Sequence, residues 1–155
     1  MTIRILIADD LAVVAEGLKH LIEAQEDLQV VAIVGDGREA VRIAKEAQPH
    51  VVLMDLSMPE LNGADATRAI VENDPKCRVI VLSMYAEREY VRRALKSGAA
   101  GYVVKEKDGR RNRYHIQAHL PLPEPTARER TVGEVLALLT GTETTVTWTS
   151  EKAGT

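Results

Sequence analysis

The sequence of 155 residues has one cysteine, no long apolar run and no excess of basic residues. A single cysteine, Cys77, excludes an internal disulfide and fits a reducing compartment. No apolar stretch approaches the roughly 20 residues that a membrane-spanning helix needs. The apolar run that begins at Ile3 leaves no room for a secretory signal peptide. These absences lead us to expect a cytoplasmic protein that does not bind membranes.

The net charge of −3 is unevenly distributed along the chain. Residues 1–105 hold 13 Lys and Arg against 16 Asp and Glu, whereas residues 106–155 hold seven of each. Neither part has the basic excess of a dedicated nucleic-acid-binding domain. The length suffices for one domain with a sizeable core and an appendage.

Short apolar runs alternate with amphipathic segments over the first 105 residues. Helical periodicity predicts helices between the runs, and apolar, β-branched composition predicts that the runs are strands. The expected strands are 3–8, 29–34, 50–54, 78–83 and 101–104, and the expected helices are 11–22, 40–47, 63–73 and 87–97, with Gly98 as the C-cap of the last. This alternation predicts a parallel sheet covered by helices on both faces.

Acidic residues follow two of the predicted strands. Asp9 and Asp10 come directly after the first strand, and Asp55 follows the third. Because the carboxyl ends of parallel strands meet at one edge of the sheet, the three carboxylates should converge there. Such a cluster of like charges is unfavourable unless a divalent cation neutralises it, so the sequence predicts a Mg²⁺ site.

The two later strands end in a hydroxyl and an amine. Ser83 ends the fourth strand, and Lys105 follows the fifth. The same edge therefore carries carboxylates, a hydroxyl donor and a cation. This combination suits a phosphoryl group, with Mg²⁺ on one side and the hydroxyl and ammonium on the other.

Residues 1–105 resemble the receiver domain of two-component response regulators, and most closely the NarL/FixJ subclass, whose members carry a LuxR-type DNA-binding domain. The resemblance implies a flavodoxin-like, doubly wound sheet of five parallel strands in the order 2-1-3-4-5. It also implies a Mg²⁺-dependent phosphoacceptor, not an enzyme, that takes a phosphoryl group from a sensor histidine kinase and switches conformation to regulate transcription. The matching segments are 6–10, 35–40, 51–63, 82–83 and 98–105.

The resemblance also implies a role for each residue of the site. Asp55 would accept the phosphoryl group. Asp10, Asp55 and the backbone carbonyl of Ser57 would hold Mg²⁺, and Asp9 would support the metal directly or through water. The residues that bind the phosphate and carry the switch would be Ser83, Lys105 and Tyr102. In the loop after Asp55, we expect Gly63 to adopt an unusual backbone conformation.

Other interpretations of these residues are weaker. Residues 35–40 fit the dinucleotide pattern G-x-G-x-x-A, but that turn should follow the first strand and here follows the second. A phosphohydrolase with an aspartyl-phosphate intermediate would carry a second Asp two residues after the nucleophile, where this chain has Ser57. His115 and His119 have a spacing that metal ligands use on helices, but no helical pattern surrounds them.

The family pattern is lost after Lys105, where an amphipathic helix usually follows. We divide the chain into a receiver core at 1–105, a polar, Pro-rich linker or degenerate last helix at 106–125, and a C-terminal segment at 126–155. That segment is either a docking helix over 128–140 or the remnant of a LuxR-type helix-turn-helix, followed by a disordered tail. No recognition helix follows, so DNA is a partner only if a functional output domain exists. A stand-alone receiver and a homodimer both stay open.

Overall fold

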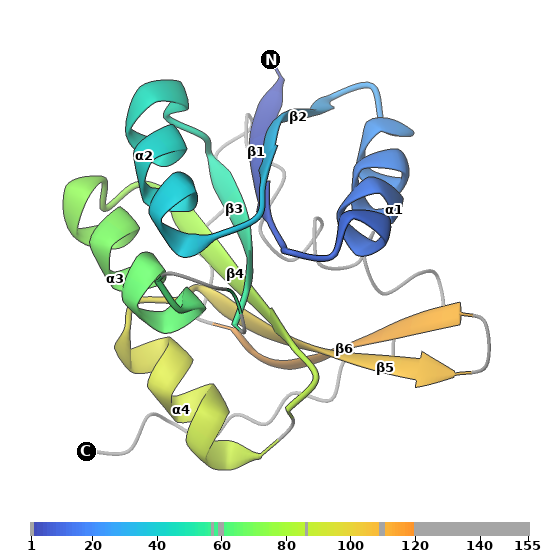
Figure 1. Cartoon of the computed structure of the whole chain (residues 1–155), viewed down its shortest axis with the longest axis vertical. Coiled ribbons are helices and arrows are strands. Elements are labelled where there is room, and N and C mark those ends of the chain that lie inside the picture. Colours follow the sequence, from blue (N-terminus) through green and yellow to red (C-terminus); the bar gives the residue numbers. More distant parts are fainter. Residues whose placement is uncertain (1, 57, 59–60, 86, 109–110, 120–155) are drawn as a thin grey trace.

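The computed structural model describes residues 2–56, 58, 61–85, 87–108 and 111–119, of which 105–108 and 111–119 are described by their backbone alone (Figure 1). Helices and strands alternate along most of this part of the chain. The order is β1 (Ile3–Ala8), α1 (Ala12–Glu23), β2 (Leu28–Val34), α2 (Gly37–Ala47), β3 (Val51–Asp55), α3 (Gly63–Asn73), β4 (Arg78–Ser83), α4 (Arg88–Lys96), β5 (Gly101–Asp108) and β6 (Arg111–His119). None of these helices has the length and hydrophobicity needed to span a bilayer.

The sheet has the strand order β2-β1-β3-β4-β5-β6. The first five strands are parallel, and β6 pairs with β5 in the antiparallel direction. The order 2-1-3-4-5 is therefore confirmed, with one strand added at the edge. Apolar side chains on both faces of β1, β3 and β4 explain why these strands occupy the middle of the sheet.

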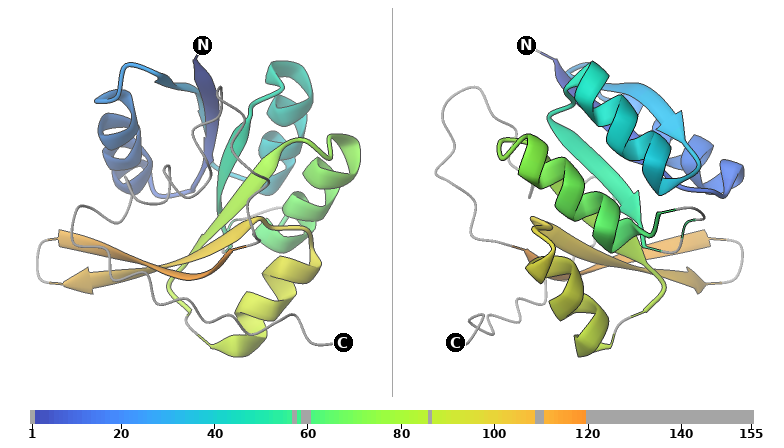
Figure 2. Two further views of the ribbon diagram at one scale, coloured as in Figure 1. Left: turned by 180° about the vertical axis from the view of Figure 1, so that it is seen from behind. Right: turned by 60° about the vertical axis from the view of Figure 1, so that its left-hand side comes forward.

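Helices cover the two faces of the sheet unequally. On one face, α2, α3 and α4 pack side by side against a core that includes Met54, Val81 and Tyr102 (Figure 2). On the other face, α1 packs against β1 and β2, and the core there includes Leu53 and Ile80. Each layer of the core therefore contains alternate residues of the same strands, as expected for a pleated sheet.

Side-chain caps fix the loops that lead from two strands into the next helices. The Asp36 carboxylate accepts a hydrogen bond from the Glu39 amide at 2.8 Å, and the Asn62 side chain accepts one from the Asp65 amide at 3.0 Å. Both satisfy amide groups that the first turn of a helix leaves free. At the end of α4, the C-cap is Ser97, and Gly98 follows it with a left-handed φ of 102°, one residue beyond the predicted cap position.

The structure corrects the expectation for residues 101–119. The sequence predicted a strand that ends at 104, followed by a linker or a short helix, but β5 continues to Asp108 and β6 returns beside it. Facing positions in this hairpin pair Glu106 with Arg113 and Asp108 with Arg111. Opposite charges at directly facing positions favour antiparallel pairing. The charged run that resembled a linker is therefore compatible with two strands.

The hairpin also separates two histidines that had the spacing of metal ligands. His115 lies opposite Val104 and His119 opposite Gly101, both in β6. Four residues of strand span about 13 Å, whereas one helical turn would have brought the two side chains together. The domain boundary at 125 and the segment 126–155 lie outside the described residues.

Candidate functional site

Three carboxylates converge at the carboxyl edge of the sheet. Oxygen atoms of Asp9, Asp10 and Asp55 all lie within 4.8 Å of one another. The register of β1 and β3 explains this, because Ala8 pairs with Met54 and the acidic residues come next on both strands. The topology thus brings together the three residues that the sequence singled out.

The members of this cluster differ in exposure and support. Asp9 is 4% exposed, Asp55 is partly buried and Asp10 is exposed. One Asp9 carboxylate oxygen accepts a hydrogen bond from the Leu11 amide at 2.9 Å, and the Asp9 amide donates to the Val34 carbonyl at 2.9 Å. Asp9 is therefore fixed between β1, β2 and the start of α1, while Asp10 and Asp55 are reachable from outside.

The donor set of the cluster indicates which cation would fit. The three side chains offer only carboxylate oxygens, which hard cations such as Mg²⁺ and Ca²⁺ prefer. The cluster contains no thiolate or imidazole that would favour Zn²⁺ or Cu²⁺. The residues present therefore fit a hard divalent cation.

Ser83 lies next to the carboxylate cluster at the end of β4. Asp55 pairs with Leu82 in the register of β3 and β4, so Ser83 is one residue beyond that pair. The residue is 4% exposed, and its hydroxyl oxygen accepts a hydrogen bond from the Tyr85 amide at 3.0 Å. A serine hydroxyl carries one proton, which it can donate to an anion at this edge only by leaving its present partner.

Tyr102 connects β5 to the loop after β4. Its ring is fully buried, and its hydroxyl donates a hydrogen bond to the Tyr85 carbonyl at 2.6 Å. Burial raises the pKa of the Tyr102 phenol, a hydrogen bond with Ser83 opposes this, and the nearby Glu87 and Tyr90 raise it further. Ser83, Tyr85 and Tyr102 therefore form one polar group beside the carboxylates, in which Tyr85 was not identified from the sequence.

Tyr85 also contacts α4. Its ring stacks on that of Tyr90 with centroids 4.7 Å apart and an interplanar angle of 17°. In the sequence, the two tyrosines lie five positions apart around the predicted start of a helix, and this spacing is the signal that could have identified Tyr85. Tyr85 thus fixes the loop after β4 in two ways: its carbonyl binds Tyr102 of β5, and its ring stacks on Tyr90 of α4.

The backbone of Lys105 is placed at the same edge, but inside a strand. Ser83 pairs with Val104, and Lys105 follows within β5, where it faces Tyr114 of β6. The expectation that the strand ends before Lys105 was wrong. Ser57, expected to offer its backbone carbonyl, lies outside the described residues.

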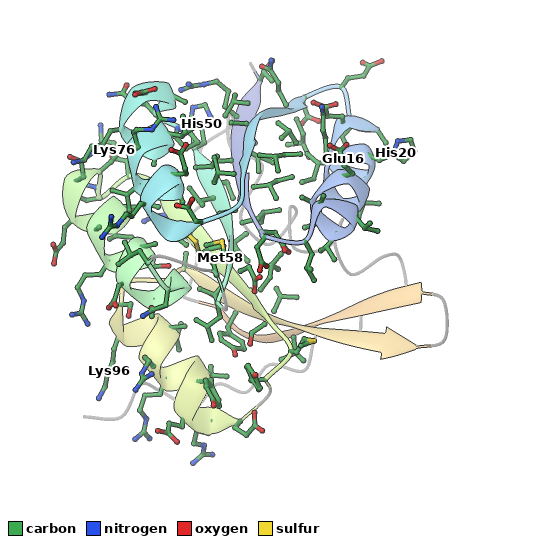
Figure 3. The ribbon with its side chains drawn as sticks, viewed as in Figure 1. Glu16, His20, His50, Met58, Lys76 and Lys96 are labelled. Carbon is green, nitrogen blue, oxygen red and sulfur yellow. The ribbon has the colours of Figure 1, made fainter. Side chains whose placement is uncertain are left out.

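The loop after Asp55 needs a glycine for a reason other than the expected one. Gly63 does not have a left-handed backbone; instead, a Cβ atom there would overlap the Asp55 carbonyl oxygen and the Leu56 Cα. The Gly63 amide donates to the Leu56 carbonyl at 3.1 Å. Between them in the chain, Met58 (labelled in Figure 3) is buried in the core that α2 and α3 cover. Close approach of two backbone segments therefore fixes the position of Asp55.

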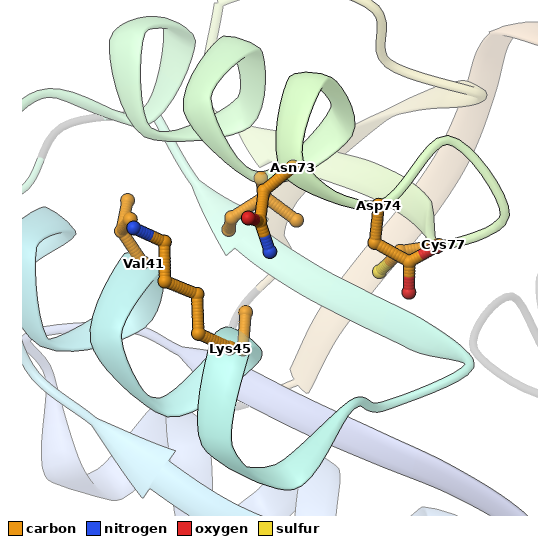
Figure 4. A pocket seen from close by; sticks show the side chains of 7 residues that line it. Val41, Lys45, Asn73, Asp74 and Cys77 are labelled. Carbon is orange, nitrogen blue, oxygen red and sulfur yellow. The ribbon is translucent and has the colours of Figure 1, made fainter.

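A shallow groove between α2 and α3 lies near the opposite edge of the sheet (Figure 4). Cys77, at its base, precedes β4 and is 4% exposed. Burial raises the pKa of the Cys77 thiol to about 12, with the nearby Asp74 adding to the shift. The thiol is therefore protonated and unreactive at neutral pH, and the groove takes no part in the carboxylate site.

Comparison with known proteins identifies the family. The model of the response regulator receiver domain matches residues 5–117. The transcriptional regulatory protein DegU of Brevibacillus brevis is 41% identical over 106 residues, which are 68% of this chain and 45% of DegU. The chain spans about half the length of the curated relatives it matches.

Solved structures agree with this. A LuxR-family two-component response regulator from Aurantimonas sp. is 38% identical with a TM-score of 0.66, and the match covers 70% of this chain and 77% of that one. A chain of the CheX–CheY–BeF₃–Mg²⁺ complex from Borrelia burgdorferi is 29% identical with a TM-score of 0.63, and the match covers 68% and 79%. The strand order, the carboxylate cluster and the family match together show that this chain belongs to the response regulator receiver domains.

Proposed function

We propose that this chain is a phosphoacceptor in a two-component phosphorelay and takes a phosphoryl group on Asp55 from a phosphohistidine of a sensor kinase. The observation that carries the proposal is the convergence of the Asp9, Asp10 and Asp55 carboxylates within 4.8 Å. Asp55 is partly buried, so a ligand can reach it, and Ser83 lies directly beside it.

Transfer to Asp55 requires two anions to meet. An oxygen of the Asp55 carboxylate forms a bond to phosphorus as the bond from phosphorus to the histidine nitrogen of the donor breaks. Asp10 and Asp55, with the backbone carbonyl of Ser57, would hold Mg²⁺, and Asp9 would support the metal directly or through water. Bound there, Mg²⁺ removes charge repulsion between the carboxylate and the incoming phosphoryl group. The chain lacks a second carboxylate two residues after Asp55, so any release of phosphate by the protein itself would be slow.

The new phosphate would act on the neighbouring polar groups. It adds a charge of about −1.5 to −2 at the end of β3. Lys105 would pair with it, and the Ser83 hydroxyl would donate to a phosphate oxygen. Because the Ser83 oxygen accepts from the Tyr85 amide, and the Tyr85 carbonyl accepts from Tyr102, movement of Ser83 would disturb both contacts. The loop after β4 and Tyr102 are thus the elements that would switch.

Transcriptional control is the output we propose, since DegU is named a transcriptional regulatory protein. Since β5 continues to Asp108 and β6 ends at His119, the division we propose is a receiver unit that includes both strands and a separate C-terminal segment at 126–155. DNA contact by this chain would need a functional output domain, and the alternative is a stand-alone receiver with no DNA-binding output. A homodimer is compatible with either output. Phosphorelay from a kinase would take place in the cytoplasm.

Labelling with radioactive acetyl phosphate in Mg²⁺ tests the assignment. We expect the full chain to be labelled, and Asp55→Asn or chelation of Mg²⁺ to abolish the label. Asp36→Asn is the matched control, because Asn caps a helix as well as Asp does and the α2 cap would persist. Label that remains on Asp55→Asn would contradict the proposal.

A further inference from the structure

Within the described part of the chain, the sheet ends in β2 on one side and in β6 on the other. β6 is the last strand in the order, and its outer edge has no strand beside it among the described residues. Strand edges of this length expose amides and carbonyls that pair readily with another segment. On the face that α1 covers, Leu82 of β4 and Val103 of β5 are buried, although α1 is the one described helix that contributes to that core.

The 36 residues after His119 contain one helical and one strand pattern. Thr126 and Glu129 have the spacing of a capping box, and Gly141 suits a C-cap. Between them, apolar residues recur at helical spacing. Residues 144–149 then consist only of β-branched and aromatic residues, which favour a strand. The apolar positions of the helical pattern are Val132, Val135, Leu136 and Leu139.

The direction of each crossover determines which face its helix covers. α1 connects β1 to β2 toward one edge, whereas α2, α3 and α4 connect strands toward the other, and the two groups lie on opposite faces (Figure 2). Both arrangements follow from the right-handedness of parallel crossovers. Since β6 runs antiparallel to β5, a right-handed crossover from β6 outward must place its helix on the face of α1. Among the described helices, α1 alone lies on that face.

We propose that residues 126–149 complete the sheet as a right-handed β–α–β unit with β6. The helical segment lies over β5 and β6 on the α1 face, and residues 144–149 pair with the outer edge of β6, parallel to it. The 24 residues between His119 and residue 144 exceed the dozen that a parallel crossover needs. β6 ends opposite Gly101, at the amino edge, so the helix returns along the sheet before the last strand begins.

This docking has a consequence for the site. β5 carries Tyr102 and Lys105, so the docked unit would pack beside the strand on which the switch residues lie. The proposal does not depend on phosphorylation, since it follows from the open edge and the topology. Its occupant is intramolecular, because tethering keeps the segment at an effective concentration that a second copy reaches only in concentrated solution.

Trp148 reports directly on the proposal, because it is the single tryptophan of the chain. In the native full chain, we expect its emission to be blue-shifted relative to the urea-unfolded chain and its quenching by acrylamide to be several-fold weaker. Both results should be independent of protein concentration. Quenching equal to that of the unfolded chain would overturn the proposal, and protection that appears only as concentration rises would assign the edge to a second copy instead.

Two pairs of variants test the geometry. Leu136→Asp should restore Trp148 quenching, whereas Ala137→Asp, about 100° away around the helix, should not. Thr147→Pro should also restore Trp148 quenching, because it removes an amide from the paired strand. Thr142→Pro, which lies before the strand, should leave the quenching unchanged. Acetyl phosphate labelling at Asp55 verifies that each variant keeps the receiver fold. Equal effects of variant and control in both pairs would also overturn the proposal.

Discussion

The amino edge of the sheet, where the parallel strands begin, and the carboxyl edge, where they end, use polar groups in opposite ways. At the amino edge, the Arg4 guanidinium donates to the carbonyls of Ala47 and Gln48, the latter at 2.7 Å. The Arg4 amide donates to Nδ1 of His50 at 3.0 Å, and the His50 amide donates to the Arg4 carbonyl at 2.9 Å (His50 is labelled in Figure 3). Polar groups there tie α2, β1 and β3 together.

The carboxyl edge shows the reverse arrangement. Asp9, Asp10 and Asp55 place like charges within 4.8 Å, which opposes folding when no cation neutralises them. Functional sites commonly retain such unfavourable contacts because a ligand relieves them. The comparison teaches that the amino edge contributes stability and the carboxyl edge contributes binding, and substitutions at each edge should separate the two contributions.

The largest expected effect concerns the reactivity of the Cys77 thiol at the amino edge. Burial raises the pKa of the Cys77 thiol to about 12 from its ordinary value of 9.0. At pH 8 the thiolate fraction should therefore be about a thousandfold lower in the folded chain than in the unfolded chain. Timed reaction with a thiol reagent, in buffer and in urea, measures this ratio. Equal rates would show that this edge opens readily.

The raised pKa of the Cys77 thiol should also make the stability of the fold depend on pH. Because the folded state favours the protonated thiol, its contribution to stability is complete below pH 9 and decreases as pH rises from about 9 toward about 12. Cys77→Ala should remove this part of the alkaline loss. An identical alkaline unfolding profile for the two proteins would contradict the assignment.

The next effect concerns the loop at the carboxyl edge. Gly63→Ala should destabilise the fold by about 3 kcal/mol, because the new Cβ overlaps the Asp55 carbonyl and forces the backbone apart. Urea unfolding measures this loss, and acetyl phosphate labelling should fall as Asp55 moves.

Gly17→Ala is the matched control for this change. Nothing lies within 4 Å of a Cβ at Gly17, which is inside α1, so the substitution should stabilise by roughly 0.5–1 kcal/mol. Similar stability for the two variants would indicate that Gly63 is not required by close approach.

A smaller loss is expected from Arg4→Ala. The two carbonyls that Arg4 binds terminate α2, and hydrogen bonds from a charged group contribute roughly 2 kcal/mol. Labelling of Asp55 should be unchanged under conditions where the variant is folded. Arg42→Ala, which removes an exposed pairing with Glu39 and Glu46, should change stability little. Loss of labelling in folded Arg4→Ala would mean that the edges are not separable.

Most of the fold could be predicted because local signals agreed with the topology. The bounds of α3 and β4 were predicted to the residue, since Pro75 stops the helix and the apolar run after it marks the strand. The convergence of the three aspartates followed from parallel strands alone. The extension of β5 and the strand β6 could not be predicted, because residues of opposite charge face each other across the hairpin and are far apart along the chain. The role of Gly63 depends on a backbone contact with Asp55, which no local pattern encodes.

The smallest expected effect tests whether a bound cation relieves the charge repulsion among the carboxylates at the carboxyl edge. Mg²⁺ at ten times its Kd should stabilise the chain by about 1.4 kcal/mol, since it binds the folded state. Asp10→Asn should raise stability without Mg²⁺, because it removes one of three like charges, and should abolish the gain on adding Mg²⁺. Thermal unfolding with and without Mg²⁺ measures both changes, and Asp36→Asn serves as the control with an unaltered response. If Asp10→Asn lowered stability without Mg²⁺, the carboxylates would be stabilising one another through bonds of their own, and the contrast between the edges would fail.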